Sequence, residues 1–125
     1  MKTKHLLFAT LLFAVISCSN NSNTLNVADF KKSLSDSTTI LLDVRTPEEY
    51  ASGHFAGAVN LDVENIRAGK LPDSAKTQPL YIYCRSGNRS AQATELLKAA
   101  GYTAVTDLGG LDDVEAMGGT LITAP

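Results

Sequence analysis

The sequence has few cysteines, no tryptophan and no excess of positive charge, and these shortages exclude several classes of protein. It contains only 2 cysteines in 125 residues, so a disulfide scaffold is excluded. The 11 Lys and Arg against 13 Asp and Glu give a net charge of -2, which leaves no basic excess for binding a nucleic-acid backbone. With 2 histidines beside the 2 cysteines, no metal-ligand cluster is present, and no metal or cofactor is expected.

The remaining composition is typical of one folded domain. Hydrophobic residues make up 44% of the chain and charged residues 19%, a balance that excludes an intrinsically disordered protein. A domain usually has roughly 100–200 residues, so the chain has no room for a separate cofactor-binding domain. The sequence contains no internal repeat.

The first 17 residues are predicted to be a secretory signal peptide. Two lysines near the start precede an apolar run at 6–16, which is shorter than the roughly 20 residues that a membrane-spanning helix needs. The segment ends in Val-Ile-Ser-Cys, which resembles a bacterial lipobox and implies cleavage before Cys18 and a lipid on that residue. The polar residues that follow predict a tether over 18–24 and a folded domain over 25–125.

A lipid on Cys18 implies a membrane partner and a place in the bacterial cell envelope, facing the periplasm. Ser19 is compatible with sorting to the outer membrane in a cell with two membranes. An ordinary cleaved signal with a chance cysteine is the alternative. If Cys18 carries the lipid, Cys84 is the only free thiol, and a dithiol mechanism within one chain is excluded.

Short apolar or β-branched runs alternate with helical patterns through the predicted domain. Thr46, Pro47 and Glu49 form the signature of a capping box with proline in the first turn, and Gly53 ends that helix. Asn26 suits the N-cap of the preceding helix. Strands are predicted at 38–44, 57–61, 79–84 and 103–106, and further helices at 27–34, 63–68, 89–100 and 111–117. This alternation predicts a mostly parallel sheet with helices on both faces.

Residues 84–90, Cys-Arg-Ser-Gly-Asn-Arg-Ser, connect an apolar strand to a helix. Ligands of open α/β sheets bind beyond the carboxyl ends of the strands, and Cys84 lies at such an end. Helix N-terminal N–H groups and the guanidinium groups of Arg85 and Arg89 favour a thiolate and suit an anionic ligand. Gly87 permits an unusual backbone conformation. The pattern predicts a nucleophilic Cys84 that acts on an anionic substrate; a buried, inert cysteine is the alternative.

Three segments carry a resemblance to a known family. They are LDVRTPEEY at 42–50, GHFAGAVNL at 53–61 and YCRSGNRS at 83–90, and the glycine pair at 109–110 follows them. In type, order and spacing they resemble a single-domain rhodanese, a thiosulfate sulfurtransferase-type module. The resemblance covers about residues 25–123.

The resemblance implies an α/β fold of the rhodanese type, with a central parallel sheet of about five strands flanked by helices on both faces. It implies that Cys84 becomes a persulfide, receiving sulfur from a small anionic donor such as thiosulfate and passing it to cyanide, a thiol or a protein acceptor. Backbone N–H groups of 85–89 would hold the outer sulfur. The substrate-binding residues are expected to be Arg85, Ser86, Gly87, Asn88 and Arg89, and the mainly structural signature residues Asp43, Arg45 and His54.

The sequence departs from the family pattern after the glycine pair. The family often has a tryptophan where this chain has Val114, which places one packing contact near the site in doubt. Asp112 and Asp113, with Glu115, add negative charge where the mouth of the site is expected. Such charge would disfavour a dianion such as thiosulfate, unless it belongs to a solvated helix face.

Two other functions use a similar loop. Phosphatases and arsenate reductases also place a cysteine and an arginine around an anion, but their spacing is C-x5-R, whereas Cys84 and Arg89 form C-x4-R. The shorter loop makes a smaller cradle, which suits a sulfur atom better than a tetrahedral phosphate. A persulfide carrier or protein-interaction module without efficient turnover of its own is the second alternative. The lack of a resolving cysteine argues against a redox function of the thiol.

Overall fold

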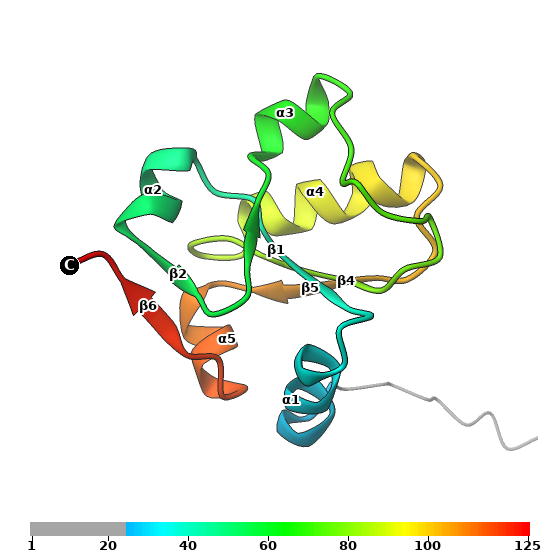
Figure 1. The fold of residues 1–125 in the computed structure, drawn as a ribbon. Helices are drawn as coiled ribbons and strands as arrows, with labels where there is room; N and C mark the ends of the chain where they lie inside the picture. Colours follow the sequence, from blue (N-terminus) through cyan, green and yellow to red (C-terminus); the bar gives the residue numbers. More distant parts are fainter. Residues whose placement is uncertain (1–24) are drawn as a thin grey trace, which may run out of the picture.

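A computed structural model describes residues 25–125, which form a central sheet between two layers of helices (Figure 1). All strand pairs in this sheet are parallel, as the sequence predicted. The strand order β3-β1-β4-β5 places the two most buried strands in the middle. The strands are β1 (Ile40–Asp43), β3 (Val59–Asn60), β4 (Leu80–Tyr83) and β5 (Val105–Gly109).

Helices cover both faces of the sheet, also as predicted. The face of Leu42 and Ile82 packs against α3 (Val63–Arg67) and α4 (Asn88–Ala99). The opposite face, with Leu41 and Tyr81, packs against α1 (Val27–Ser35) and α5 (Leu111–Ala116). Two hydrophobic clusters therefore form the core, one on each side of the sheet. Figure 1 shows α2 (Pro47–Ser52) beyond the carboxyl end of β1.

The number and grouping of strands differ from the expectation. The central sheet has four strands and not about five. Two further strands, β2 (Gly53–Phe55) and β6 (Leu121–Thr123), form a separate antiparallel pair that the sequence did not predict. Three residues are too few to show a periodic pattern in the sequence. Each of these strands is stabilised by pairing with a segment that is distant in the sequence, and local strand propensity does not indicate such pairing.

Local capping signals are confirmed by the structure. The Thr46 hydroxyl accepts a hydrogen bond from the Glu49 N–H at 3.2 Å, and the Glu49 carboxylate accepts one from the Thr46 N–H at 3.0 Å. Gly53 is the C-cap of the same helix. The Asn26 side chain caps α1 through the Asp29 N–H at 2.9 Å. These caps fix the ends of α1 and α2.

The predicted signal peptide (1–17), the tether (18–24) and the lipid-bearing Cys18 lie outside the described residues. Within 25–125, no helix is both long and apolar enough to span a membrane. The strand predicted at 103–106 is found as β5, at 105–109, so its start was placed two residues early.

Candidate active site

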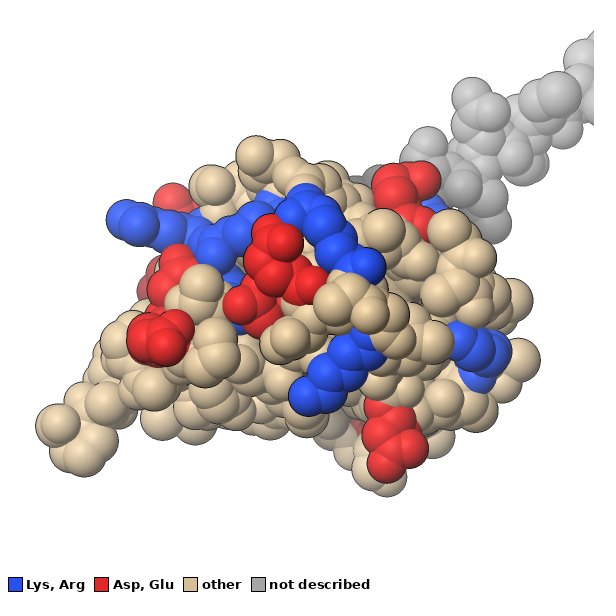
Figure 2. Space-filling model, turned by 90° about the horizontal axis from the view of Figure 1, so that it is seen from above, with Lys and Arg blue, Asp and Glu red and all other residues tan. Residues whose placement is uncertain are grey.

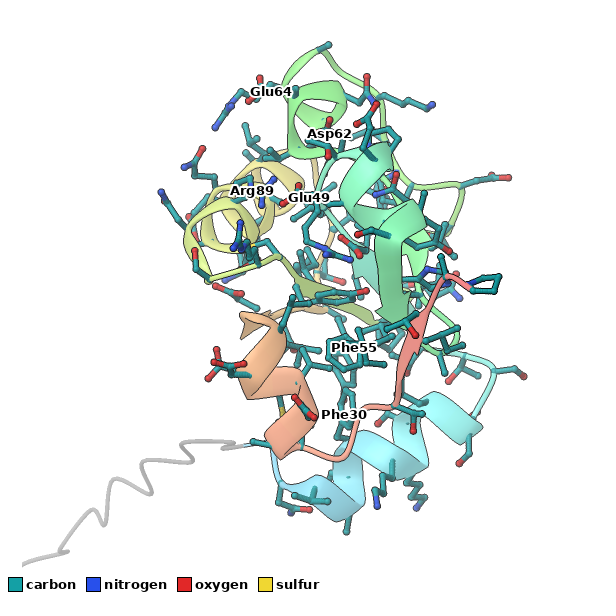
Figure 3. All side chains as sticks on the ribbon, turned by 90° about the vertical axis from the view of Figure 1, so that its left-hand side faces the viewer. Phe30, Glu49, Phe55, Asp62, Glu64 and Arg89 are labelled. Atoms are coloured by element: carbon teal, nitrogen blue, oxygen red, sulfur yellow. The ribbon has the colours of Figure 1, made fainter. Side chains whose placement is uncertain are left out.

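Cys84 directly follows β4, the strand between β1 and β5, and α4 begins four residues later. Figure 3 looks onto this end of the molecule, where the carboxyl ends of the parallel strands and the N-terminus of α4 meet. Gly87 is the N-cap of α4 and has a φ of 96°, in the left-handed region that favours glycine. The loop can therefore turn tightly from strand to helix around the cysteine.

The thiol of Cys84 is buried, with 1% of the residue exposed. Its Sγ accepts a hydrogen bond from the Gly87 N–H at 3.0 Å and lies 3.5 Å from the Ser90 hydroxyl. The Ser90 hydroxyl also donates to the Gly87 carbonyl oxygen at 3.0 Å. A hydroxyl can rotate, so Ser90 can donate to the sulfur when the sulfur is ionised.

The surroundings lower the pKa of Cys84. Burial acts in the opposite direction and is the largest single influence. The Ser90 hydroxyl and the backbone N–H groups of Ser90, Gly87 and Ser86 together outweigh it. Hydrogen bonds to an anion favour the ionised form, so the loop stabilises the thiolate that a nucleophilic cysteine needs.

We therefore expect alkylation of Cys84 by iodoacetamide to reach its full rate at a pH below that of an ordinary cysteine. Ser90→Ala removes one stabilising donor, so the midpoint of the rate against pH should rise by about 1 unit, the size of a hydrogen bond to a charged group. The measurement is the loss of free thiol at a series of pH values. A midpoint that stays unchanged in Ser90→Ala would contradict a role for Ser90 in stabilising the thiolate.

The glycine pair at 109–110, at the end of β5, holds the active-site loop in place. The Cys84 N–H donates to the Gly109 carbonyl at 3.0 Å, and the Leu111 N–H donates to the Arg85 carbonyl at 3.1 Å. A Cβ atom at Gly110 would lie 2.7 Å from the Arg85 carbonyl oxygen, which is closer than real Cβ atoms approach backbone. Glycine is therefore required at 110 because the loop packs directly on it.

The two arginines of the loop have different surroundings. Arg85 is exposed, and within 25–125 no carboxylate forms an ion pair with it. Arg89 donates to both carboxylate oxygens of Glu49, at 2.7 and 2.9 Å, and the two side chains are 30% and 29% exposed. Figure 3 shows them together at the site, with Asp62 nearby. Arg89 is therefore already paired with an anion inside the protein.

Glu49 joins α2 to α4. The hydrogen bonds from Arg89 are the main reason that the pKa of Glu49 is lowered to about 2, and the Thr46 N–H acts in the same direction. The carboxylate in turn raises the pKa of Arg89. The pair stays ionised at every pH at which the protein is expected to work. The sequence places Glu49 in the capping box and in the family-like segment at 42–50, but nothing local signals its contact with Arg89.

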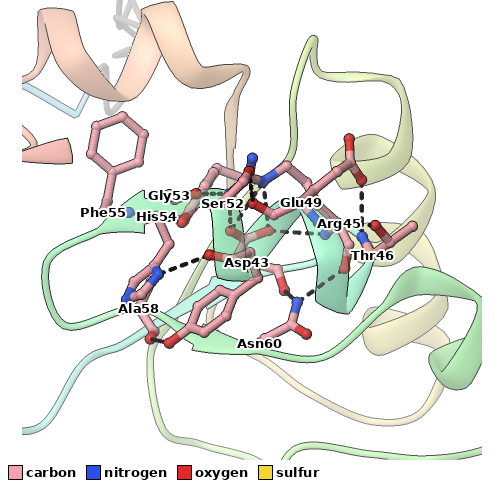
Figure 4. A network of polar contacts seen from close by, with 12 residues as sticks. Asp43, Arg45, Thr46, Glu49, Ser52, Gly53, His54, Phe55, Ala58 and Asn60 are labelled. Atoms are coloured by element: carbon pink, nitrogen blue, oxygen red, sulfur yellow. Dashed lines mark hydrogen bonds and ion pairs between the residues drawn. The ribbon is translucent and has the colours of Figure 1, made fainter. Parts of the chain in front are cut away.

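Asp43 and Arg45 form a buried ion pair behind the site (Figure 4). The Arg45 guanidinium donates to Asp43 at 2.7 Å and to the Gly53 carbonyl at 2.6 Å. The Asn60 amide donates to the carbonyl oxygens of Asp43 and Arg45. These contacts tie the end of β1 to the start of β2 and to β3.

The His54 ring packs on Tyr50 of α2. The two ring centroids are 3.8 Å apart, and the His54 Nδ1 lies 3.0 Å from the Tyr50 carbonyl oxygen. The Tyr50 hydroxyl donates to the Ala58 carbonyl at 2.7 Å. His54 thus closes the loop between α2 and β3, and these contacts belong to the local structure.

The acidic segment after the glycine pair includes a capping residue. The Asp113 carboxylate accepts a hydrogen bond from the Gly110 N–H at 2.7 Å, at the start of α5. Asp112 and Glu115 are exposed. Val114 is fully buried with Phe30 and Phe55, so it occupies a core position. Among residues 25–125, no three His, Cys, Asp or Glu side chains group as metal ligands.

Comparisons with known proteins agree with this architecture. Residues 26–117 match the model of the rhodanese-like domain. Thiosulfate sulfurtransferase PspE of Escherichia coli (strain K12) is 40% identical over 76 residues, which are 58% of this chain and 71% of that protein. A tRNA uridine(34) hydroxylase of Listeria welshimeri is 34% identical over 93 residues, 69% of this chain but only 28% of that longer protein.

A solved structure described as a rhodanese with anions from E. coli has the same fold. It superimposes with a TM-score of 0.57 at 34% identity, and the match covers 69% of this chain and 99% of the other. The family match spans the whole sheet and the cysteine loop of this chain. The chain therefore belongs to the rhodanese-like domain family, and its relatives include sulfurtransferases.

Proposed function

We propose that the protein is a sulfurtransferase that carries sulfane sulfur as a persulfide on Cys84. The observation that supports this most directly is the environment of Sγ, which accepts an N–H hydrogen bond in a loop that lowers its pKa. A thiolate held in this way is a nucleophile without the help of a general base. The relationship to a thiosulfate sulfurtransferase supports the same chemistry.

The proposed reaction has two steps. The Cys84 thiolate attacks the outer sulfur of thiosulfate, the bond between the two sulfur atoms of the donor breaks, and sulfite leaves with the bonding electron pair. An acceptor such as cyanide then attacks the outer sulfur of the persulfide, forms thiocyanate and restores the thiolate. A thiol or a protein thiol would accept the sulfur in the same way in a cell.

The loop supplies the remaining roles. Backbone N–H groups of 85–89 would bind the anionic outer sulfur, as donors fixed in advance of the reaction. Arg85 and Arg89 would attract an anionic donor, and Ser86, Gly87 and Asn88 shape the cradle. Asp43, Arg45 and His54 would hold the surrounding backbone.

The test is the mass of a soluble protein comprising residues 19–125 after exposure to thiosulfate. Cys84 is the only cysteine in this range, so a gain of one sulfur atom that cyanide then removes would locate the persulfide. No gain from thiosulfate or polysulfide would contradict the proposal. A persulfide that turns over only with a protein partner would favour a carrier.

We also propose that a lipid on Cys18 anchors the mature protein in the bacterial cell envelope, facing the periplasm. The support is the lipobox-like end of the apolar run at 6–16. Full-length protein expressed in a bacterium should partition with membranes and carry an acyl-modified N-terminal Cys18. Cys18→Ser protein found in the membrane fraction to the same extent would overturn the anchor.

A further inference from the structure

Glu49, the ion-pair partner of Arg89, has no part in the reaction described above. Glu49 is not in the cysteine loop, yet both of its carboxylate oxygens accept hydrogen bonds from Arg89 at 2.7 and 2.9 Å. Arg89 also feels the negative charge of Asp62 and of the Cys84 thiolate. The carboxylate occupies two of the five N–H donors of the Arg89 guanidinium and offsets its positive charge, so Arg89 attracts a second anion less strongly than an unpaired arginine would.

Other basic side chains near the site also lie beside carboxylates. On the face seen in Figure 2, a row of basic side chains borders a group of acidic side chains, so positive and negative charge lie side by side. On α3, Arg67 is paired with Glu64. Arg85 is thus the guanidinium of the loop that stays without a carboxylate partner in the described part of the chain. A dianionic donor would find little net positive charge here.

We propose that Glu49 is a specificity-determining residue, which cancels the charge of Arg89 and directs the site toward sulfane-sulfur donors of low negative charge. This rests on the proposed sulfurtransferase function. Glu49 touches Arg89 and not the reacting sulfur, so it acts through the arginine. The favoured donor class is a monoanion that carries an outer sulfur, as opposed to the dianion thiosulfate.

A matched pair of donors measures this preference. Thiosulfate and methanethiosulfonate present the same outer sulfur, but a methyl group replaces one oxygen in the second, so its charge is one unit smaller. With methanethiosulfonate, the thiolate takes the outer sulfur and methanesulfinate leaves with the electron pair. The product on the protein is the same Cys84 persulfide, so one assay serves both donors.

Glu49→Gln tests the proposal with little change of shape. Glutamine also serves in a capping box, and its carbonyl oxygen still accepts one hydrogen bond from Arg89. Removing one negative charge near the donor should raise kcat/KM about tenfold for thiosulfate and about threefold for methanethiosulfonate at low salt, because the Coulomb energy scales with donor charge. High salt should shrink both gains.

Glu48→Gln is the control. Glu48 is the exposed neighbour of Glu49 in the first turn of α2, so the same substitution there changes the net charge and the helix N-terminus equally. In Glu48→Gln, the ratio of kcat/KM for thiosulfate to kcat/KM for methanethiosulfonate should stay as in the wild-type protein. A change in the Cys84 pKa would affect both donors alike and would cancel in that ratio.

The outcomes separate this inference from the proposed function. A shift of the donor ratio toward thiosulfate in Glu49→Gln, absent in Glu48→Gln, supports it. An unchanged ratio in Glu49→Gln overturns it, even if both rates fall, because Glu49 would then be merely structural. If wild-type Cys84 takes up sulfur from neither of these donors nor from polysulfide, the sulfurtransferase function itself is refuted.

Discussion

Cys84→Ser is expected to lose sulfur transfer by at least about 1000-fold, because the reaction depends on a nucleophile that is already ionised. A serine hydroxyl has no comparable tendency to ionise, and its oxygen cannot form a persulfide. The measurement is thiocyanate formed from thiosulfate and cyanide, together with the mass of the protein. Cys84 has 1% exposure, so serine must be accommodated inside the loop.

The fold of this variant can be verified independently of its activity. The Gly87 N–H that points at Sγ and the neighbouring Ser90 hydroxyl can both hydrogen-bond a serine oxygen. The urea midpoint of Cys84→Ser should therefore stay close to that of the wild-type protein. A correctly folded variant that keeps most of its activity would rule out a Cys84 persulfide.

Arg45→Met is expected to destabilise the fold by about 3–5 kcal/mol, because it leaves the Asp43 carboxylate buried without its cation. Asp43 has 0% exposure and Arg45 has 4%. Small domains have a total stability of about 5–15 kcal/mol, so this loss is a large fraction of it. The measurement is urea unfolding, followed by circular dichroism.

Two controls separate the buried charge from the loss of a side chain. Arg67→Met removes an exposed partner of Glu64 by the same substitution and should cost less than about 1 kcal/mol. Asp43→Asn combined with Arg45→Met removes both charges and should be more stable than Arg45→Met alone. Equal losses in Arg45→Met and Arg67→Met would show that the pair is not important for stability.

Signals that lie within a few residues of each other predicted local structure well. The capping box of Thr46 and Glu49 needs only a three-residue spacing, and Gly53 ends that helix as expected. The apolar run at 79–84 and the polar loop after it located Cys84 between a strand and a helix. These features depend on residues that are close together in the sequence, so the sequence alone predicts them.

Contacts between distant segments could not be predicted in this way. Glu49 and Arg89 are 40 residues apart, and no local pattern marks either as the partner of the other. The predicted strand ends three residues before β5 does, at 106, because Asp107 and Gly109 are poor strand formers; pairing with β4 makes them part of the strand.

The burial of Cys84 has a consequence for the fate of the transferred sulfur. In the proposed persulfide the outer sulfur would lie about 2 Å from Sγ, and an acceptor can reach the inner atom only if the loop that buries Cys84 opens. A bulky thiol therefore meets the outer atom first, and attack there regenerates the protein. Attack on the inner atom would form a dead-end mixed disulfide, which the mature chain has no second free cysteine to resolve if Cys18 carries a lipid. The depth of the cysteine thus favours turnover over self-inactivation.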